Sequence, residues 1–519
     1  MAVAWRRLPG WLPTVLAGAL ASIAALAGWR GVDFPAQLYR VGLFHRDGLV
    51  IWDSRWYGGH WTFDYSVLFP PLAGTLGIQI TAILSAATAA FAFDRLVVGH
   101  FALRARPASL LFAVGTLAPV AIGQLPFLLG EALALSACLA ATRRRWLVAA
   151  ALATGAGLAS PLAGAFLGLT TAAWLIASWR TNAVGLGIVT VASLAPVAIT
   201  AAVFPGEGAM PFPATDFAQL AAVFAVLWFL IPRRERALRI GAAVYLGAIA
   251  ACFVLASPVG GNISRLGEGL GAPLAMCLLW PRRRWFAVAA VVPLVALQWS
   301  PAFAVFGADR SDPSTNSQYF APLLQFLETS DRPLGRVEVV PTRLHWEAAY
   351  VASRFPLARG WERQLDIADD PLFYDHGALN VSTYRAWLLD NGVRYIALPD
   401  VPVDYAAVGE RRLLEAGVPG LGPPQRIGRW RVFDVAGAPG LVDGPGQVTS
   451  LDGSQMTVDA QAPGSLVLRV RYDPRWTVVN DGGCLEPGPG QWTTLSVRRP
   501  GEFKLALRLL GDRDGGCSQ

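Results

Sequence analysis

Long apolar stretches alternate with short polar connections over the first three hundred residues of the chain. Residues 11–29 and 68–93 are each long enough to cross a bilayer, which takes about 20 apolar residues. Nine more stretches follow, several of them shorter than a full crossing: 109–123, 127–141, 147–159, 164–177, 184–204, 217–231, 240–256, 269–280 and 286–303. The pattern predicts a polytopic α-helical membrane domain over residues 1–304, with about 11 transmembrane helices and the first stretch retained as a helix.

The pattern changes after residue 304. Residues 319–327 and 382–391 are helix-like, whereas 336–340 and 394–398 are strand-like, which favours an α/β module over residues 305–435. From 436 to 519, Gly and Pro separate short alternating runs at 455–460, 465–472, 492–497 and 502–509. Short strands with turn residues between them are typical of a β-sandwich.

Composition agrees with a membrane protein, since only 15% of the 519 residues are charged, against about a quarter in soluble proteins. The net charge of +7 does not indicate a nucleic-acid partner, because the basic residues cluster between apolar stretches. Such clusters stay cytoplasmic; they are Arg6-Arg7, Arg104 with Arg106, Arg143-Arg144-Arg145, Arg233-Arg234 with Arg236 and Arg239, and Arg282-Arg283-Arg284. We therefore expect a cytoplasmic N-terminus and an extracytoplasmic C-terminal domain in a bacterial cell membrane.

The five cysteines divide by location. Cys138, Cys252 and Cys277 lie in apolar stretches, where we expect them to be packing residues. Cys484 and Cys517 lie in the C-terminal region, where an extracytoplasmic location favours a disulfide between them. Two cysteines alone leave the free thiols open as an alternative.

The connection over residues 30–65 contains most of the candidate chemistry. Four polar residues, Asp33, Asp53, His60 and Asp64, are expected at the extracytoplasmic membrane surface, where the pKa of a carboxyl group can be tuned for base catalysis. Four aromatic residues accompany them and offer faces on which sugars stack: Trp52, Trp56, Tyr57 and Trp61. The alternative is an ordinary solvated loop, because Trp and Tyr gather at membrane interfaces in any case.

The order of residues in this loop resembles that of the GT-C superfamily of membrane glycosyltransferases. The catalytic subunit of oligosaccharyltransferase has a similar order to Asp33, Leu38-Tyr39-Arg40, Trp52-Asp53 and Trp56-Tyr57-Gly58-Gly59. Residues 469–507 also resemble the terminal β-module of YfhO-like membrane glycosyltransferases. The resemblance implies that Asp33 is the catalytic base. Because neither an Asp-x-Asp in a second outer loop nor a Trp-Trp-Asp-Tyr-Gly segment is present, it implies the metal-independent, inverting branch that uses polyprenyl-phosphate sugars.

A lipid-phosphate donor requires a cation at the same membrane face. Arg265 and Asn262 lie in the Gly-rich segment 260–271, where Arg can bind phosphate in a bidentate manner and free backbone N–H groups can assist. Arg40 is a second candidate, and Glu131, with Gln124 nearby, is a candidate for lining the donor cavity. The alternatives are a local ion pair of Arg265 with Glu268, and a helix-capping role for Glu131.

The sequence thus predicts a membrane glycosyltransferase that transfers a sugar from a polyprenyl-phosphate donor to a glycan or lipid-linked acceptor of the cell envelope. Membrane lipids are the other expected partners, and no cofactor is expected. Polar-aromatic patches in the C-terminal region, around His345 to Glu347 and Arg359 to Asp366, are either acceptor-binding surfaces or internal ion pairs. A transporter or flippase of envelope lipids, and a non-catalytic assembly factor, are the alternatives.

Overall fold

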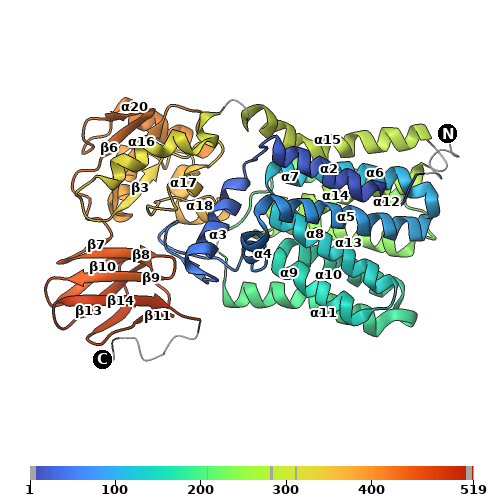
Figure 1. Ribbon diagram of the computed structural model, residues 1–519, viewed down its shortest axis with the longest axis horizontal. Helices are drawn as coiled ribbons and strands as arrows, with labels where there is room; N and C mark the ends of the chain where they lie inside the picture. The colour runs from blue at the N-terminus through green and yellow to red at the C-terminus, as the bar shows by residue number, and fades with distance from the viewer. Residues whose placement is uncertain (1–7, 207, 281–283, 310–311, 510–516, 518–519) are drawn as a thin grey trace. The chain divides into compact units, whose positions relative to one another are not determined.

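The chain divides into two compact units. A computed structural model of the protein describes residues 8–206, 208–280, 284–309, 312–509 and Cys517 (Figure 1). Unit 1 comprises Met1–Gln37 and Asp64–Ser311, and unit 2 comprises Leu38–Phe63 and Asp312–Gln519. The predicted boundaries differ from this division, because most of the 30–65 connection groups with the C-terminal half and the two C-terminal modules form one unit. Of the predicted cytoplasmic clusters, Arg6, Arg7, Arg282 and Arg283 lie outside the described residues.

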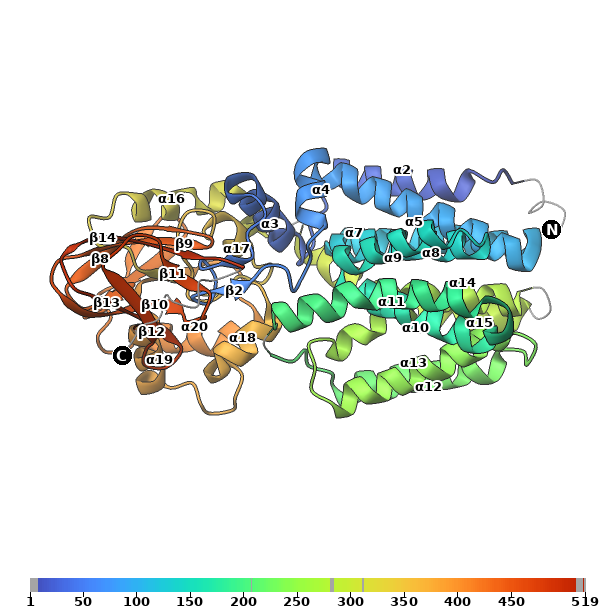
Figure 2. The same cartoon turned by 90° about the horizontal axis from the view of Figure 1, so that it is seen from below.

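Unit 1 is a bundle of helices, and each predicted apolar stretch overlaps at least one of them. The helices are α2 (Leu12–Leu26), α4 (Phe69–Leu76), α5 (Ile78–Phe101), α6 (Arg106–Gly115), α7 (Leu117–Ile122), α8 (Leu125–Thr142), α9 (Trp146–Ala159), α10 (Pro161–Ala177), α11 (Trp179–Val203), α12 (Ala214–Leu230), α13 (Arg236–Val254), α14 (Ser264–Leu279) and α15 (Arg284–Asp309). Figure 2 shows the longer ones running side by side.

Within the part of unit 1 that the structure describes, five segments are long and apolar enough to cross a membrane: Ile78–Ile122, Leu125–Thr142, Trp179–Val203, Arg236–Val254 and Trp285–Val305. The apolar helices α2, α9, α10 and α12 are shorter. Several long apolar helices are compatible with a membrane protein. The predicted number of about 11 crossings is not established by these lengths.

Small residues allow the helices of unit 1 to approach closely. A methyl group at Gly130 of α8 would lie 2.5 Å from Cβ of Ala163 on α10, and one at Gly157 of α9 would lie 2.6 Å from Pro196 of α11. Lipid tails are as apolar as leucine, so helices in a membrane associate through such close packing rather than through hydrophobic burial. Alanine therefore dominates the core formed by α2, α5, α6 and α8.

The N-terminal part of unit 2 is an α/β module. Its sheet has the strand order β3-β4-β6-β5, with β3 (Arg336–Val339) parallel to β4 (Val393–Pro399) and the remaining pairs, through β6 (Trp430–Asp434) and β5 (Gln425–Ile427), antiparallel. The helices of this module are α16 (Ser317–Glu328), α17 (Glu347–Tyr350), α18 (Arg363–Asp369), α19 (Val381–Asp390) and α20 (Val408–Ala416).

Two four-stranded antiparallel sheets follow, so the prediction of a β-rich C-terminal region is confirmed. One sheet has the order β12-β13-β10-β7 and the other β11-β14-β9-β8. The strands are β7 (Val442–Asp443), β8 (Gly446–Asp452), β9 (Gln455–Ala460), β10 (Gly464–Arg471), β11 (Trp476–Val478), β12 (Gly483–Pro487), β13 (Trp492–Val497) and β14 (Gly501–Leu507). Buried and open positions alternate along β9 and β14, as in a sheet with one face in a core.

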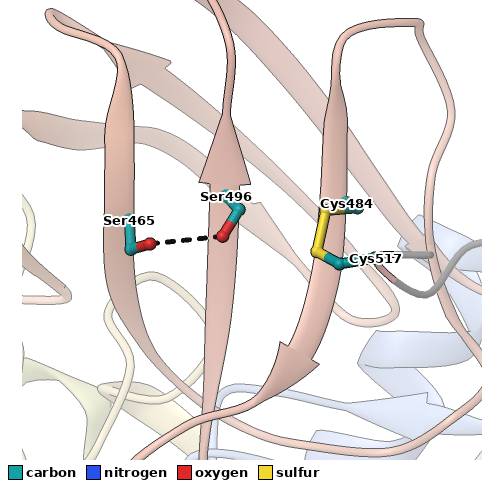
Figure 3. The surroundings of a disulfide bond; sticks show 4 residues. All are labelled: Ser465, Cys484, Ser496 and Cys517. Atoms are coloured by element: carbon teal, nitrogen blue, oxygen red, sulfur yellow. Dashed lines mark hydrogen bonds between the residues drawn. A yellow bond between two sulfur atoms is a disulfide. The ribbon is translucent and has the colours of Figure 1, made fainter. Parts of the chain in front are cut away.

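A disulfide joins Cys484 of β12 to Cys517 near the C-terminus (Figure 3). Cys484 pairs in register with Ser496 of β13, which pairs in turn with Ser465 of β10. Directly opposed residues share a face of the sheet, and the two serine hydroxyl groups are hydrogen-bonded at 3.2 Å. The disulfide predicted from the positions of the two cysteines is thus present, and it links Cys517 to β12.

The segment 38–63 connects the two modules of unit 2. It contains most of α3 (Phe34–Asp47) and a hairpin of β1 (Trp52–Asp53) and β2 (His60–Trp61). Ser54 donates its N–H to the Gly453 carbonyl of the sandwich, and the Arg55 carbonyl accepts the N–H of Leu357 in the α/β module. The segment is therefore an internal part of unit 2 and not a free loop.

Candidate functional site

A small cavity lies in unit 1 where α6, α7, α8, α14 and α15 meet. Its polar lining comes from residues spread over 183 positions of the chain. These are Gly115, Thr116, Gln124, Glu131, Arg265, Glu268 and Gln298, and the apolar wall includes Phe112, Pro119, Ile122 and Phe127. Three residues chosen from the sequence, Arg265, Glu131 and Gln124, are thereby brought together.

Arg265 is the cation of this cavity. It is half-buried in the first turn of α14, and its guanidinium lies 5.8 Å from the centre of the Phe127 ring. Among the described residues, no carboxylate oxygen lies within 4.0 Å of its guanidinium nitrogens, so the ion pair with Glu268 that was the alternative to phosphate binding is not formed. A half-buried guanidinium without an ion-pair partner is costly and suits an anionic ligand.

Two carboxyl groups lie near this cation. Glu131 is one turn and a half into α8, and its Oε1 would lie 3.1 Å from a methyl group placed on Gly269 of α14. Glu268 is bonded to the Ser264 side chain and is within electrostatic range of Arg265. The position of Glu131 inside α8 differs from that of a helix-capping residue, because α8 begins at Leu125.

The Gly-rich turn before α14 does not offer the free backbone N–H groups that the sequence led us to expect. Gly260 donates to the Ser257 hydroxyl at 3.2 Å, Gly261 to the Pro211 carbonyl at 3.3 Å, and Asn262 to the Val259 carbonyl at 2.9 Å. Met210 lies directly against this turn, as a methyl group on Gly260 would lie 1.9 Å from the Met210 carbonyl oxygen. Asn262 also does not line the cavity.

Asp33 lies beside the wall of the cavity. Its backbone N–H donates to the Ile122 carbonyl at 3.0 Å, and Ile122 lines the cavity. Gly123 makes this approach possible, because its φ of +95° closes α7 and a methyl group there would lie 2.4 Å from the Phe34 nitrogen. The first residues after α2 are therefore fixed against the end of α7.

Asp64 also belongs to unit 1, but its neighbours differ from those of Asp33. A methyl group on Gly206 would lie 3.1 Å from Asp64 Oδ2, so this carboxyl group lies against the connection after α11. Asp64 does not line the cavity. The pair Asp33 and Asp64, predicted to act in one loop, thus lies at two places of unit 1.

Asp53 and His60 are interior residues of unit 2. Asp53 is fully buried, and its carboxylate accepts hydrogen bonds from the Tyr39 hydroxyl at 2.6 Å and from the Arg55 N–H at 3.2 Å. His60 is 5% exposed, and burial lowers its pKa against the opposing effect of Asp53. These contacts are those of structural residues, so we do not assign catalysis to either.

The four aromatic residues predicted to stack on sugars are covered by other side chains. Trp56 lies between Tyr39 and His60, with ring centres at 4.4 Å and 5.2 Å. Trp52 packs edge-on against Trp61, and Tyr57 donates to the Glu362 carbonyl at 3.0 Å. Their exposed fractions are at most 7%, so we do not assign sugar stacking to them.

Arg40, the second candidate for phosphate binding, is already paired. It forms a buried ion pair with Glu362, and its guanidinium lies over the rings of Trp56 and Trp361 at 5.7 Å and 5.8 Å. Arg40 is thus an interior, paired residue of unit 2, and we do not assign phosphate binding to it.

Sequence reasoning missed Gln298 and Thr116. Both lie in apolar stretches and are 7% and 3% exposed, and Gln298 Nε2 donates to the Gly115 carbonyl at 3.4 Å. A glutamine within the apolar run of α15 was the available signal, because a buried amide group needs polar partners. Its partners, more than 180 residues away, could not be identified from the sequence.

No protein-family model matches the chain, and no curated protein sequence is significantly similar to it.

Proposed function

We propose that the protein is a membrane glycosyltransferase of the GT-C type, which uses a polyprenyl-phosphate sugar as donor. The observation that carries the proposal is Arg265, a half-buried cation in a cavity among apolar helices, with no carboxylate within ion-pair distance in the described part of the chain. A lipid-linked donor has the matching chemistry, since an anionic phosphate adjoins both a sugar and an apolar chain. Arg265 would hold the phosphate, while Glu131 and Gln124 would accept hydrogen bonds from sugar hydroxyl groups.

In the proposed reaction, an acceptor hydroxyl oxygen attacks the anomeric carbon of the sugar and the bond to the phosphate oxygen breaks, with inversion at carbon. Asp33, fixed beside the cavity wall through the Ile122 carbonyl, takes the proton of the acceptor. The leaving polyprenyl phosphate carries the electron pair, and Arg265 stabilises its charge. Charge stabilisation by fixed groups in a site that excludes water is the largest contribution in many enzymes.

An extracytoplasmic location of unit 2 is part of the proposal, with a glycan or lipid-linked acceptor of the envelope. The disulfide between Cys484 and Cys517 supports it, because disulfides persist in oxidising compartments and are rare in the cytosol. The arginine-rich connections agree with this. Helix α8 has 18 residues and is therefore about 27 Å long. Its N-terminal end lines the cavity, and its C-terminal end leads into Arg143-Arg144-Arg145, so the cavity and this arginine cluster lie at opposite ends of the helix.

The test is sugar transfer by full-length protein in membranes supplied with a labelled polyprenyl-phosphate sugar. Arg265→Gln is expected to lower kcat/KM on the order of 100-fold, the loss of one charge-assisted interaction in the transition state. Asp33→Asn is expected to lower kcat with little change in KM. Arg180→Gln, an exposed arginine at the start of α11, is the matched control and should retain wild-type rates. Full transfer by both Arg265→Gln and Asp33→Asn would contradict the proposal.

A transporter of phosphate-bearing lipids is the second candidate, favoured by the polar lining that Gln298 and Thr116 add within apolar helices. The two functions differ in product. Protein reconstituted in liposomes should form a labelled glycan if it is a transferase, whereas a transporter moves the intact lipid-linked sugar between leaflets without forming a new glycosidic bond.

A further inference from the structure

Unit 2 contains a cluster of buried charges that takes no part in the proposed reaction. Five side chains form it: Glu338 on β3, Arg359 before α18, Asp366 on α18, Asp370 just after it, and Glu410 on α20. Glu338 and Glu410 are fully buried, and the other three are at most 5% exposed. The sequence offered ion pairs as one interpretation of part of this region, but the distances between these positions along the chain gave no indication of the cluster.

Arg359 is at the centre. Its Nε and Nη2 donate to the two oxygens of Asp366 at 2.9 Å and 2.6 Å. Its remaining nitrogen, Nη1, lies 3.5 Å from Glu410 Oε2 and 4.0 Å from Glu338 Oε1. One guanidinium is thus shared by three carboxyl groups, and only Asp366 binds it in a bidentate manner.

The side chains around this centre supply hydrogen bonds to its carboxyl groups. Tyr384 on α19 donates to Glu410 Oε1 at 2.7 Å, and Trp387 on the same helix donates to Asp370 Oδ1 at 2.7 Å. Tyr374 donates to Asp366. Two other cations interact with the cluster: Arg363 is bound to Asp404 at 2.9 Å and 3.0 Å, and Arg336 of β3 donates to the backbone carbonyl groups of Asn391 and Arg469.

Charge balance therefore requires protons. Among the described residues, Arg359 is the one cation within ion-pair distance of any of the four carboxyl groups, of Glu338, Asp366, Asp370 and Glu410. Arg336 and Arg363 act on Asp370 and Asp366 from farther away, so ionisation of all four would leave an excess of negative charge in the interior. Isolated buried carboxylates are so unfavourable that such groups take up protons instead. The adjacent Asp369 does not relieve the balance, because it pairs with Arg471 at 3.0 Å.

We propose that the Glu338–Glu410 carboxyl pair around Arg359 binds protons as part of the folded state of unit 2, and that α20 detaches from the sheet when these protons are lost above neutral pH. Glu338 belongs to β3 and Glu410 to α20, so ionisation of both sets two like charges between the sheet and this helix. The ligand of this site is the proton, and the element that responds is α20. The inference does not depend on the proposed glycosyltransferase activity.

The pKa shifts of the individual carboxyl groups support the binding of protons by this pair. Burial raises the pKa of Glu410 to about 7 and that of Asp370 to about 8, and burial with the neighbouring Glu410 holds the pKa of Glu338 well above its ordinary value. Asp366 behaves oppositely, because Arg359 outweighs its burial and lowers its pKa. Raised carboxyl pKa values stabilise the fold fully below the ordinary pKa, and this stabilisation is lost as pH rises through about 7 and 8.

The test is hydrogen exchange of α20 in the full-length protein, in detergent, at about pH 6 and about pH 9. After correction for the intrinsic pH dependence of exchange, protection of α20 amides should fall on the order of 10- to 100-fold at the higher pH, since each unit of pKa shift is a tenfold bias. Glu338→Gln, which mimics the protonated form, should remove most of this loss. Glu486→Gln, an exposed residue of β12, is the control and should behave as the wild type.

Two outcomes would overturn the inference. One is equal corrected protection of α20 at both pH values in the wild type. The other is a pH dependence in Glu338→Gln as large as that of the wild type. If Glu338→Gln does not fold, Glu410→Gln takes its place, and infrared spectra of the wild type decide independently: the carbonyl band of a buried carboxylic acid must be present near neutral pH and disappear as the pH is raised.

Discussion

The two units of this protein differ in how the charge of their cationic side chains is compensated. In unit 2 the guanidinium groups of Arg40 and Arg359 are buried in ion pairs with Glu362 and Asp366. The buried guanidinium of Arg336 instead donates to the backbone carbonyl groups of Asn391 and Arg469. In the described part of unit 1, Asp94 and Arg106 are paired at 2.7 Å, but Arg265 has no carboxylate within ion-pair distance. Because Arg265 also lines a cavity, an anionic ligand can take the position that a carboxylate occupies in an ion pair.

The comparison separates structural polar residues from candidate functional ones. Aromatic and acidic residues are dense in the 30–65 connection, which made them candidates, yet those in unit 2 are enclosed by one another and by later parts of the chain. Arg265 stands in a less conspicuous segment. Incomplete pairing in a cavity is thus a better indication of function here than a local concentration of polar residues.

The largest effect is expected when a partner is removed from a buried pair. Glu362→Ala leaves Arg40 buried and unpaired, which should lower the free energy of unfolding by about 3–5 kcal/mol. Chemical denaturation of the full-length protein measures it. The double variant with Arg40→Met should recover much of the loss, and Glu415→Ala, at an exposed ion pair with Arg431, should cost no more than about 1 kcal/mol. A similar loss in both single variants would remove the distinction between buried and exposed pairs.

His345 is a buried cation of unit 2 whose contribution to the free energy of unfolding depends on pH. Burial lowers the pKa of its ring, but hydrogen bonds with Asp404 and Glu347 outweigh burial and raise it to about 9. His345 therefore contributes its full stability, on the order of 3 kcal/mol, below its ordinary pKa of about 6.5, and loses it as pH rises through about 9. The φ of His345 is +56°, a conformation that Asn tolerates, so His345→Asn is the variant of choice. Denaturation midpoints that change with pH as in the wild type would contradict this role.

Tyr57→Phe is a smaller change in the enclosed aromatic cluster. It removes one buried hydrogen bond, to the Glu362 carbonyl, and is expected to lower the free energy of unfolding by about 1 kcal/mol. Sugar transfer by the folded variant should be unchanged. A large loss of transfer without loss of stability would return this residue to the list of functional candidates.

The smallest effect on stability is expected in unit 1. Arg265→Gln removes no ion pair of the protein itself, so the ligand-free variant should unfold within about 0.5 kcal/mol of the wild type. A lipid phosphate should raise the unfolding temperature of the wild type and not that of the variant, because only a ligand of the folded state shifts the equilibrium. Loss of stability without ligand would mean that Arg265 is a structural residue, as in unit 2.

Much of the fold was accessible from hydrophobic periodicity. Residues 455–460 and 492–497 were predicted as strands with the bounds that β9 and β13 have, and 319–327 and 382–391 lie in or overlap α16 and α19. Short strands were missed, such as β11 and β12, because three to five residues carry too little periodic signal. The number of membrane crossings was not decided by this pattern.

The candidate site was predictable only in part. Chemical type identified Arg265 and Glu131, because a charge within apolar surroundings is locally visible. The enclosure of Trp56 and Asp53 was not visible, since it depends on partners about 300 to 400 residues later, such as the Ser353 and Leu451 carbonyl groups that bind Arg55. A local sequence that predicts an open loop can therefore be buried by packing against residues far along the chain.

The separation of segment 38–63 from the rest of unit 2 has a consequence for biosynthesis. This segment leaves the ribosome roughly 250 residues ahead of the first residues it packs against, which at about 5–20 residues per second is a delay of about 10–50 s. During that time Trp52, Trp56 and Trp61 have none of their distant partners. We expect the nascent chain to depend on a chaperone or a lipid surface in this interval, so that depletion of such a factor should yield protein with an intact helical bundle and a protease-sensitive unit 2.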